Sequence, residues 1–154
     1  MDDKWGFHDD QKECVPHIFD FLVRDTDNHV YKAFIGDKVA IVNYSNWKCS
    51  TELYDHINFE DGKCYVTDGG QTGLYDFNNC VEIIECLYES IVKTDVWYLF
   101  KVYSSGLAGI YSLRDKKIII PCEFDDITPA YGFYKAFKNG KVGLFSEKEQ
   151  IIDC

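Results

Sequence analysis

Five short stretches of this chain are variants of one four-residue phrase. They read KWGF from Lys4, KVAI from Lys38, QTGL from Gln71, LAGI from Leu107 and KVGL from Lys141. Their third residues, always Gly or Ala, stand at positions 6, 40, 73, 109 and 143, so the spacings are 34, 33, 36 and 34 residues. A period this steady indicates an array of small repeated units. We expect a single domain, 1–154, with repeat units near 4–37, 38–70, 71–106 and 107–140 and a partial unit at 141–154.

The side-chain pattern within each unit predicts β-strands. Hydrophobic residues make up 46% of the chain and aromatic residues 16%, which is too apolar for a disordered chain. Residues 31–34 and 134–137 both read YKAF and alternate with the period of a strand that buries one face. The Asn139-Gly140 pair that follows the second of them is a strong hairpin signal. We therefore expect the aromatic segment of each unit to pair antiparallel with the phrase of the next unit, and we allow one helical turn within residues 77–90.

The small third residue of the phrase has two explanations. Gly could ease the exit from a turn through its conformational freedom, or it could leave room for a neighbouring backbone or aromatic ring. Because Ala40 fills this position once and the register is kept, we expect close packing.

These motifs resemble the WG-repeat family. The resemblance rests on KWGF at residues 4–7, on IPCEFDDI at residues 120–127 and on an aromatic strand that ends in Asn-Gly at residues 139–140, and it covers nearly the whole chain. The Trp of the phrase survives only at Trp5, and the Pro only at Pro16 and Pro121. The family implies an all-β array of stacked antiparallel hairpin repeats with no common enzymatic activity. Closure of the array by pairing of its terminal half-units would hide edge strands; an open array is the alternative.

The charge of the chain restricts its partners. It carries 26 acidic against 16 basic residues, a formal net charge of −10. Such a surface repels nucleic-acid phosphates and anionic lipids and attracts cationic partners, although solubility alone would also explain it. We expect no nucleic acid and no membrane among the partners.

The cysteines indicate a reducing compartment. There are seven, an odd number, and no two form a C-x-x-C pair. This usage favours Cys as a small apolar core residue. No apolar leader follows Met1, so we expect a cytoplasmic protein.

The sequence offers no set of residues typical of catalysis. The four histidines stand at positions 8, 17, 29 and 56, and their spacing fits no metal signature. Adjacent carboxylates such as Asp125-Asp126 lie in turns or point to opposite faces of a strand. We expect no metal, no cofactor and no enzymatic activity.

One acid recurs in each full repeat unit, after an aromatic residue. These acids are Asp20, Asp55, Glu89 and Asp125. In a stacked array they could align into an acidic ladder that binds a partner; alternatively, each could cap its local turn by accepting backbone amides. Tyrosines are frequent interface anchors. The predicted partner-binding residues are Asp9, Asp10, Asp20, Asp55, Glu89, Asp125, Asp126, Tyr54, Tyr88 and Tyr131.

These observations favour a non-enzymatic binding protein. Our sharpest hypothesis is a bacterial immunity or inhibitor protein that neutralises a basic toxin, above all a nuclease, by laying an acidic surface over the active-site face of the toxin. The protein would be a monomer or a heterodimer with that toxin. A general interaction or structural repeat module without a toxin partner is the alternative, and an enzyme with an untypical site is a third hypothesis.

Overall fold

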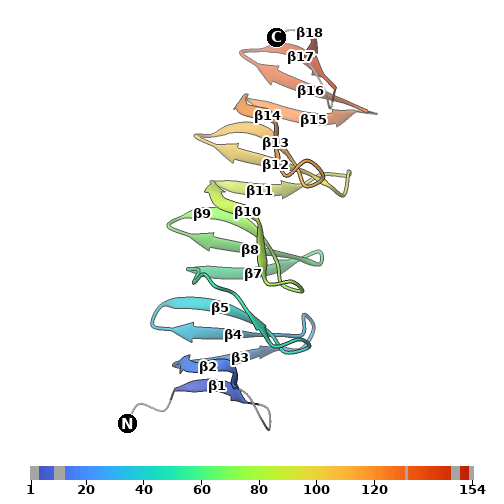
Figure 1. The fold of residues 1–154 in the computed structure, drawn as a ribbon. Helices are drawn as coiled ribbons and strands as arrows, with labels where there is room; N and C mark the ends of the chain where they lie inside the picture. Colours follow the sequence, from blue (N-terminus) through green and yellow to red (C-terminus); the bar gives the residue numbers. More distant parts are fainter. Residues whose placement is uncertain (1–3, 9–12, 131, 147–149, 153–154) are drawn as a thin grey trace. The chain divides into compact units, whose positions relative to one another are not determined.

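The chain folds into β-strands joined by turns, and no helix occurs among the residues described (Figure 1). The computed structural model describes residues 4–8, 13–130, 132–146 and 150–152. The strands are β1 (Trp5–His8), β2 (Glu13–Phe19), β3 (Phe21–Asp25), β4 (Val30–Ile35), β5 (Lys38–Asn43), β6 (Lys48–Cys49), β7 (His56–Glu60), β8 (Lys63–Asp68), β9 (Gln71–Asp76), β10 (Val81–Tyr88), β11 (Ser90–Lys93), β12 (Leu99–Ser104), β13 (Leu107–Ser112), β14 (Lys117–Phe124), β15 (Asp126–Ala130), β16 (Phe133–Lys138), β17 (Lys141–Phe145) and β18 (Gln150–Ile152).

The strands form antiparallel meanders, which confirms the predicted all-β hairpin repeats. Each four-stranded sheet takes four consecutive strands, β3 to β6, β7 to β10, β11 to β14 and β15 to β18, and β1 pairs with β2 in a two-stranded sheet. The phrase of the second to fifth repeats forms the third strand of a sheet, and the preceding aromatic segment forms the second strand. The pairings Phe34 with Val39 and Phe137 with Val142 show the expected register.

The recurring acid, rather than the phrase, marks the boundary between sheets. Asp20, Asp55, Glu89 and Asp125 each directly precede the first strand of a four-stranded sheet. At Asp20, for example, the chain leaves β2, which pairs with β1, and enters β3, which pairs with β4. Each sheet therefore begins about half a repeat before the phrase, so the incomplete repeat of the described chain is the two-stranded sheet of β1 and β2.

The small residue of the phrase lies where a neighbouring strand passes too close for a side chain. A Cβ on Gly109 would lie 2.7 Å from the Ile120 carbonyl oxygen and 2.9 Å from the Cys122 nitrogen. Gly6 meets β2 and Gly73 meets β10 in the same way, and none of the three glycines has a left-handed φ. Close packing is thus confirmed. Ala40 lies on β5, whose partner β6 has only two residues, so the partner strand ends before it would cover this position.

The allowed helical turn within residues 77–90 is wrong. Residues 77–80 form a turn, and β10 follows it as the fourth strand beside β9. The β-branched residues Val81, Ile83 and Ile84 suit an extended strand better than a helix.

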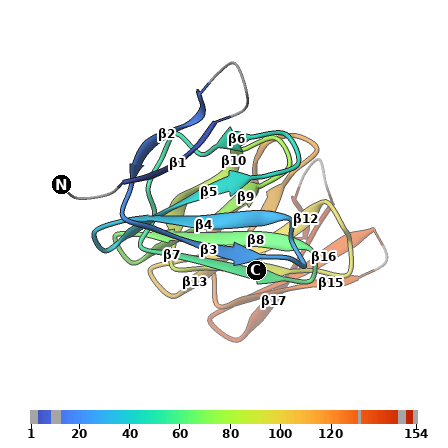
Figure 2. The same cartoon turned by 90° about the horizontal axis from the view of Figure 1, so that it is seen from below.

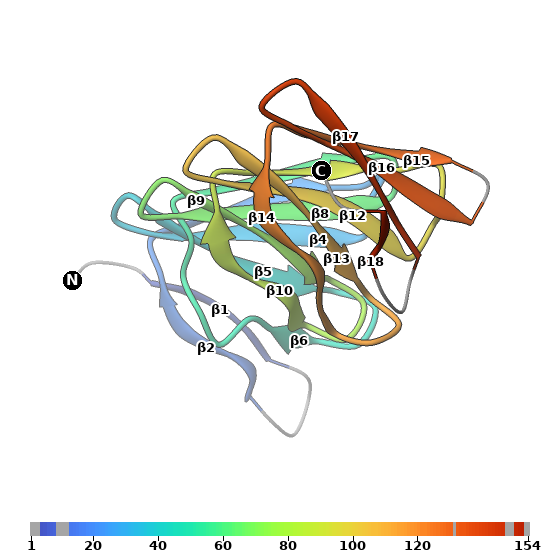
Figure 3. The same cartoon turned by 90° about the horizontal axis from the view of Figure 1, so that it is seen from above.

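The chain divides into two compact halves, residues 1–86 and residues 87–154, which we call the N-terminal half and the C-terminal half. Two clusters of buried side chains stabilise the N-terminal half, one around Ile41 and Val66 and one around Phe19 and Val42. In this half β6 lies beside β2 (Figure 2). In the C-terminal half β13 pairs with the long strand β14 (Figure 3).

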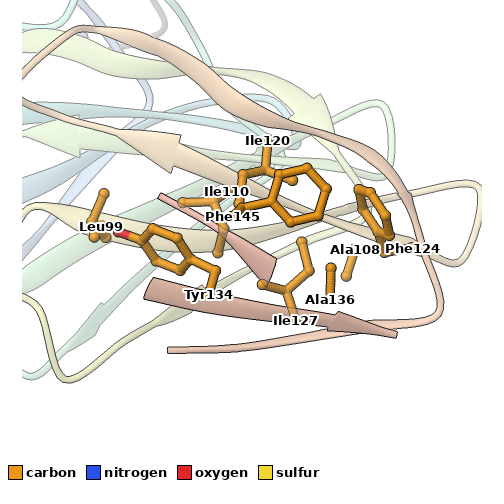
Figure 4. Close-up of a cluster of buried hydrophobic side chains, with 9 residues drawn as sticks. All are labelled: Leu99, Ala108, Ile110, Ile120, Phe124, Ile127, Tyr134, Ala136 and Phe145. Atoms are coloured by element: carbon orange, nitrogen blue, oxygen red, sulfur yellow. The ribbon is translucent and has the colours of Figure 1, made fainter. Parts of the chain in front are cut away.

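One cluster forms the core of the C-terminal half. Its buried side chains come from β12 to β17, and the ring centroids of Phe124 and Phe145 lie 5.1 Å apart at an interplanar angle of 73° (Figure 4). Such edge-to-face packing places the positive edge of one ring against the negative face of the other.

The strands at the two ends of the described chain have their own partners. β1 pairs with β2, and β17 pairs with β16 and β18. Closure by pairing of terminal half-units is therefore absent from the strand pairings of the described residues. These residues also include no helix with the length and apolar character needed to cross a membrane.

Candidate protein-binding surface

All four recurring acids cap a turn. In each repeat the carboxylate accepts a hydrogen bond from a backbone amide in the hairpin turn between the second and third strands. The N···O distances are 2.7 Å for Gly36 to Asp20, 2.8 Å for Gly69 to Asp55, 2.9 Å for Gly106 to Glu89 and 2.7 Å for Asn139 to Asp125. These amides could not bond within the strand ladder, so the carboxylate satisfies them.

The backbone of the same acids joins the following sheet. Each acid donates its amide to a carbonyl of the second strand: Asp20 to Phe34 at 2.7 Å, Asp55 to Thr67 at 2.7 Å, Glu89 to Tyr103 at 2.8 Å and Asp125 to Phe137 at 2.8 Å. The local-cap explanation thus describes these acids in every repeat. Their use in partner binding stays a prediction.

Lysines of the phrase pair with two of these carboxylates. Lys4 forms an ion pair with Asp20, and Lys38 lies 2.7 Å from Asp55 and also pairs with Asp68. The hydrogen bond from Lys4 lowers the pKa of Asp20 below its ordinary value, and the hydrogen bond from the Gly36 amide adds a smaller effect in the same direction. The pKa of Asp55 is also lowered, mainly by the hydrogen bond from Lys38 and to a smaller extent by that from the Gly69 amide.

The other predicted partner-binding residues have different surroundings. Tyr54 is only 2% exposed, and its hydroxyl lies 3.4 Å from Glu82 Oε1, so it is a core residue. Tyr88 is half-buried at the end of β10. Asp126 pairs with Lys101 at 2.7 Å. Asp9, Asp10 and Tyr131 lie outside the described residues.

The net charge of the protein belongs entirely to its N-terminal half. Residues 1–86 hold 7 basic and 17 acidic residues, whereas residues 87–154 hold 9 of each. The first half therefore accounts for the full −10 and the second for zero. The composition of the whole chain does not show this difference in charge. It becomes visible only when the boundary between the two halves is known.

Several carboxylates of the N-terminal half are free to meet a partner. Five exposed ones form no ion pair or side-chain hydrogen bond within the described part of the chain: Asp27, Asp37, Glu52, Glu60 and Glu85. In the C-terminal half Asp95 alone among the described acids has this character. None of these six is among the predicted partner-binding residues, since nothing in the repeat distinguishes them.

Three carboxylates of the N-terminal half lie close enough to interact. Partial burial raises the pKa of Glu82, hydrogen bonds with Tyr54 and Cys86 oppose this rise, and the charges of Glu85 and Glu52 add smaller upward contributions. A cation placed beside the three would relieve this repulsion. The arrangement suits a basic partner and opposes an acidic one.

Burial raises the pKa of five described thiols, those of Cys49, Cys64, Cys80, Cys86 and Cys122. Burial raises the pKa of Cys64 to about 12 and the pKa of Cys49 and Cys86 to about 11. The Cys86 and Cys122 thiols both lie near a carbonyl oxygen of the second strand, at 3.7 Å from Val66 and 3.6 Å from Val102. They occupy the same position of their repeats and pack against the second strand. A nucleophilic cysteine would need a lowered pKa.

Within the described residues no three His, Cys, Asp or Glu side chains form a group that could hold a metal ion. No model of a known protein family matches the chain, and neither does any curated protein. Membership of the WG-repeat family therefore stays a prediction.

Proposed function

We propose that this protein binds a cationic protein through the acidic surface of its N-terminal half. The observation that carries the proposal is the confinement of the net charge to residues 1–86, together with the five free carboxylates there. A charge needed only for solubility has no reason to be concentrated in one half, because solubility depends on the charge of the whole molecule.

The construction of the repeats supports a binding role. The recurring acids are engaged in turns, so the repeat keeps its fold while other surface positions vary. Hydrogen-bonded meanders of this kind hold exposed side chains in fixed places, and such preorganisation lowers the entropic cost of association. The acids that differ between repeats are then the ones that select a partner.

The partner that fits this surface best is a basic toxin, in particular a nuclease. A nuclease holds its substrate by cationic groups aimed at phosphates. An acidic protein surface competes for those groups and steers the encounter from a distance. On this proposal the protein is a cytoplasmic immunity or inhibitor protein without enzymatic activity, and it forms a heterodimer with the toxin.

Affinity capture tests the proposal. The immobilised protein is exposed to lysate of its source organism at low salt, bound proteins are eluted with a salt gradient and identified by mass spectrometry, and the eluted partner is assayed on nucleic acid. We expect a basic protein that elutes with salt and whose nuclease activity falls when the protein is added. Capture of no basic protein would refute the proposal, and a captured protein without inhibited nuclease activity would leave only the general interaction module.

A further inference from the structure

Four aromatic side chains of the N-terminal half form a continuous cluster at the surface. Phe7 of β1 lies 4.9 Å from Tyr31 and 4.7 Å from Trp47, and Tyr31 lies 5.5 Å from Tyr44, between ring centroids. We call Phe7, Tyr31, Tyr44 and Trp47 the aromatic cluster. Trp47 is 39% exposed, and the other three rings are half-buried.

The cluster is specific to one repeat. Tyr44 and Trp47 belong to the turn between the third and fourth strands, where the matching residues are Phe77 and Cys80 in the next repeat. In the repeat after that the residue matching Trp47 is Lys116. Packing of the repeat therefore does not require Trp at this position.

The backbone at Trp47 is unfavourable for a large side chain. Trp47 has a φ of 56°, and Cys80 and Lys116 have φ values of 56° and 52°. This left-handed conformation suits Gly or Asn, and a bulky residue there is uncommon. Because the conformation recurs at Cys80 and Lys116, it belongs to the turn, and only this repeat of the three fills the position with a large aromatic side chain.

The turn that carries Trp47 is held in place. The Ser45 amide donates to Asn43 Oδ1 at 2.8 Å, and the Lys48 amide donates to Asn46 Oδ1 at 3.0 Å. The Asn46 side chain also donates to the Asn78 carbonyl at 2.7 Å, which joins this turn to the following one. Trp47 is thus presented from a fixed turn, as an interface anchor should be.

The cluster already shows which chemistry its rings accept. The Arg24 guanidinium carbon lies 5.0 Å from the Tyr44 ring centroid, so one ring face takes a cation within the protein. Trp is the strongest acceptor of cations among aromatic side chains. The exposed Asp27 lies in the turn that follows Arg24, and His29 of the same turn lies with its ring centroid 5.7 Å from that of Tyr44.

We infer that the aromatic cluster is the anchor for an arginine-bearing segment of a protein partner, with a guanidinium stacked on the exposed Trp47 ring. The inference rests on the proposed function, because the acidic N-terminal half is what draws a cationic partner to this surface. Arginine fits better than lysine since its planar guanidinium stacks on an aromatic face.

A labelled synthetic peptide of alternating Arg and Gly tests the inference, with a peptide of alternating Glu and Gly as negative control. The Trp47→Gly variant removes the ring and suits the left-handed turn, so we expect it to keep a cooperative unfolding transition and to bind the Arg peptide about three- to tenfold more weakly. The matched control is Lys116→Gly, at the same turn position in the C-terminal half, whose affinity should stay that of the wild type.

A second readout follows the ring directly. In a variant that carries Trp5→Phe and Trp97→Phe, Trp47 is the one remaining tryptophan of the three. Its fluorescence emission should change on addition of the Arg peptide. If the peptide binds but neither the Trp47 emission nor the affinity of Trp47→Gly changes, the inference is wrong and the proposed function survives. If the wild type binds the Arg peptide no better than the Glu peptide, the inference and the proposed cationic partner both fall.

Discussion

At the residue scale, the recurring carboxylate is the clearest link between sequence and structure. Asp125 accepts the Asn139 amide at 2.7 Å while its own amide donates to Phe137 at 2.8 Å. One side chain thereby caps a hairpin and fixes the point at which the chain changes sheets. The sequence showed that an acid recurs, but it could not choose between a cap and a ladder because both predict the same spacing.

The cap can be tested at Asp125. Asp125→Ala leaves the Asn139 amide without its acceptor, so we expect a loss of about 1 kcal/mol in the free energy of unfolding. Asp125→Asn keeps a side-chain oxygen in place and should lose less. Urea unfolding followed by circular dichroism measures both, and equal stability of Asp125→Ala and the wild type would contradict the cap.

The ion-paired acids predict a pH dependence. The pKa of Asp55 is lowered in the folded protein by Lys38 and the Gly69 amide, so its stabilisation is present above the ordinary pKa of about 3.9 and is lost as pH falls through the lower folded value. We expect the urea midpoint of the wild type to fall more steeply below about pH 5 than that of Asp55→Asn, which keeps an amide acceptor but loses the charge. The two profiles would run parallel if the ion pair contributed nothing.

At the element scale, the fourth strand distinguishes the surroundings of Gly109 from those of Ala40. Gly109 lies under β14, a strand of eight residues, whereas Ala40 lies beside β6, a strand of two. The alternation of apolar and polar residues and the Asn-Gly turn were enough to predict the pairing of the second and third strands, because both signals are local in the sequence. The length of the fourth strand was not predictable, since it depends on packing between segments.

Substitutions at these two positions should differ in effect. In Gly109→Ala the new methyl group meets the backbone of β14 at 2.7 to 2.9 Å, so we expect a loss of about 1 to 3 kcal/mol from overpacking. Ala40→Gly removes a methyl group and should cost about 0.5 to 1 kcal/mol. Differential scanning calorimetry compares the two, and the account of the phrase is wrong if Ala40→Gly is the more damaging change.

At the scale of the whole molecule, the two halves share one repeat and differ in charge. Both halves contain the same order of strands, yet residues 1–86 carry the whole net charge of −10 and residues 87–154 carry a net charge of zero. The candidate surface could not be located from the repeat because the free carboxylates lie at positions that do not recur. Binding should therefore depend on where a charge is removed rather than on the total charge.

Two variants of equal net charge separate these effects. The N-terminal variant removes three free carboxylates from the N-terminal half through the substitutions Asp27→Asn, Glu52→Gln and Glu85→Gln. The C-terminal variant adds three cations at exposed strand positions of the C-terminal half through the substitutions Val92→Lys, Thr128→Lys and Val142→Lys. Each change raises the net charge from −10 to −7.

The dissociation constant of the captured basic partner, measured for the wild type and both variants at low and at physiological ionic strength, tests the central claim most directly. We expect the N-terminal variant to bind about tenfold more weakly, which corresponds to about 1.4 kcal/mol, with a smaller dependence on salt, while the C-terminal variant stays close to the wild type. Equal weakening of both variants would show that the partner responds to net charge alone, and an unchanged N-terminal variant would show that it binds elsewhere.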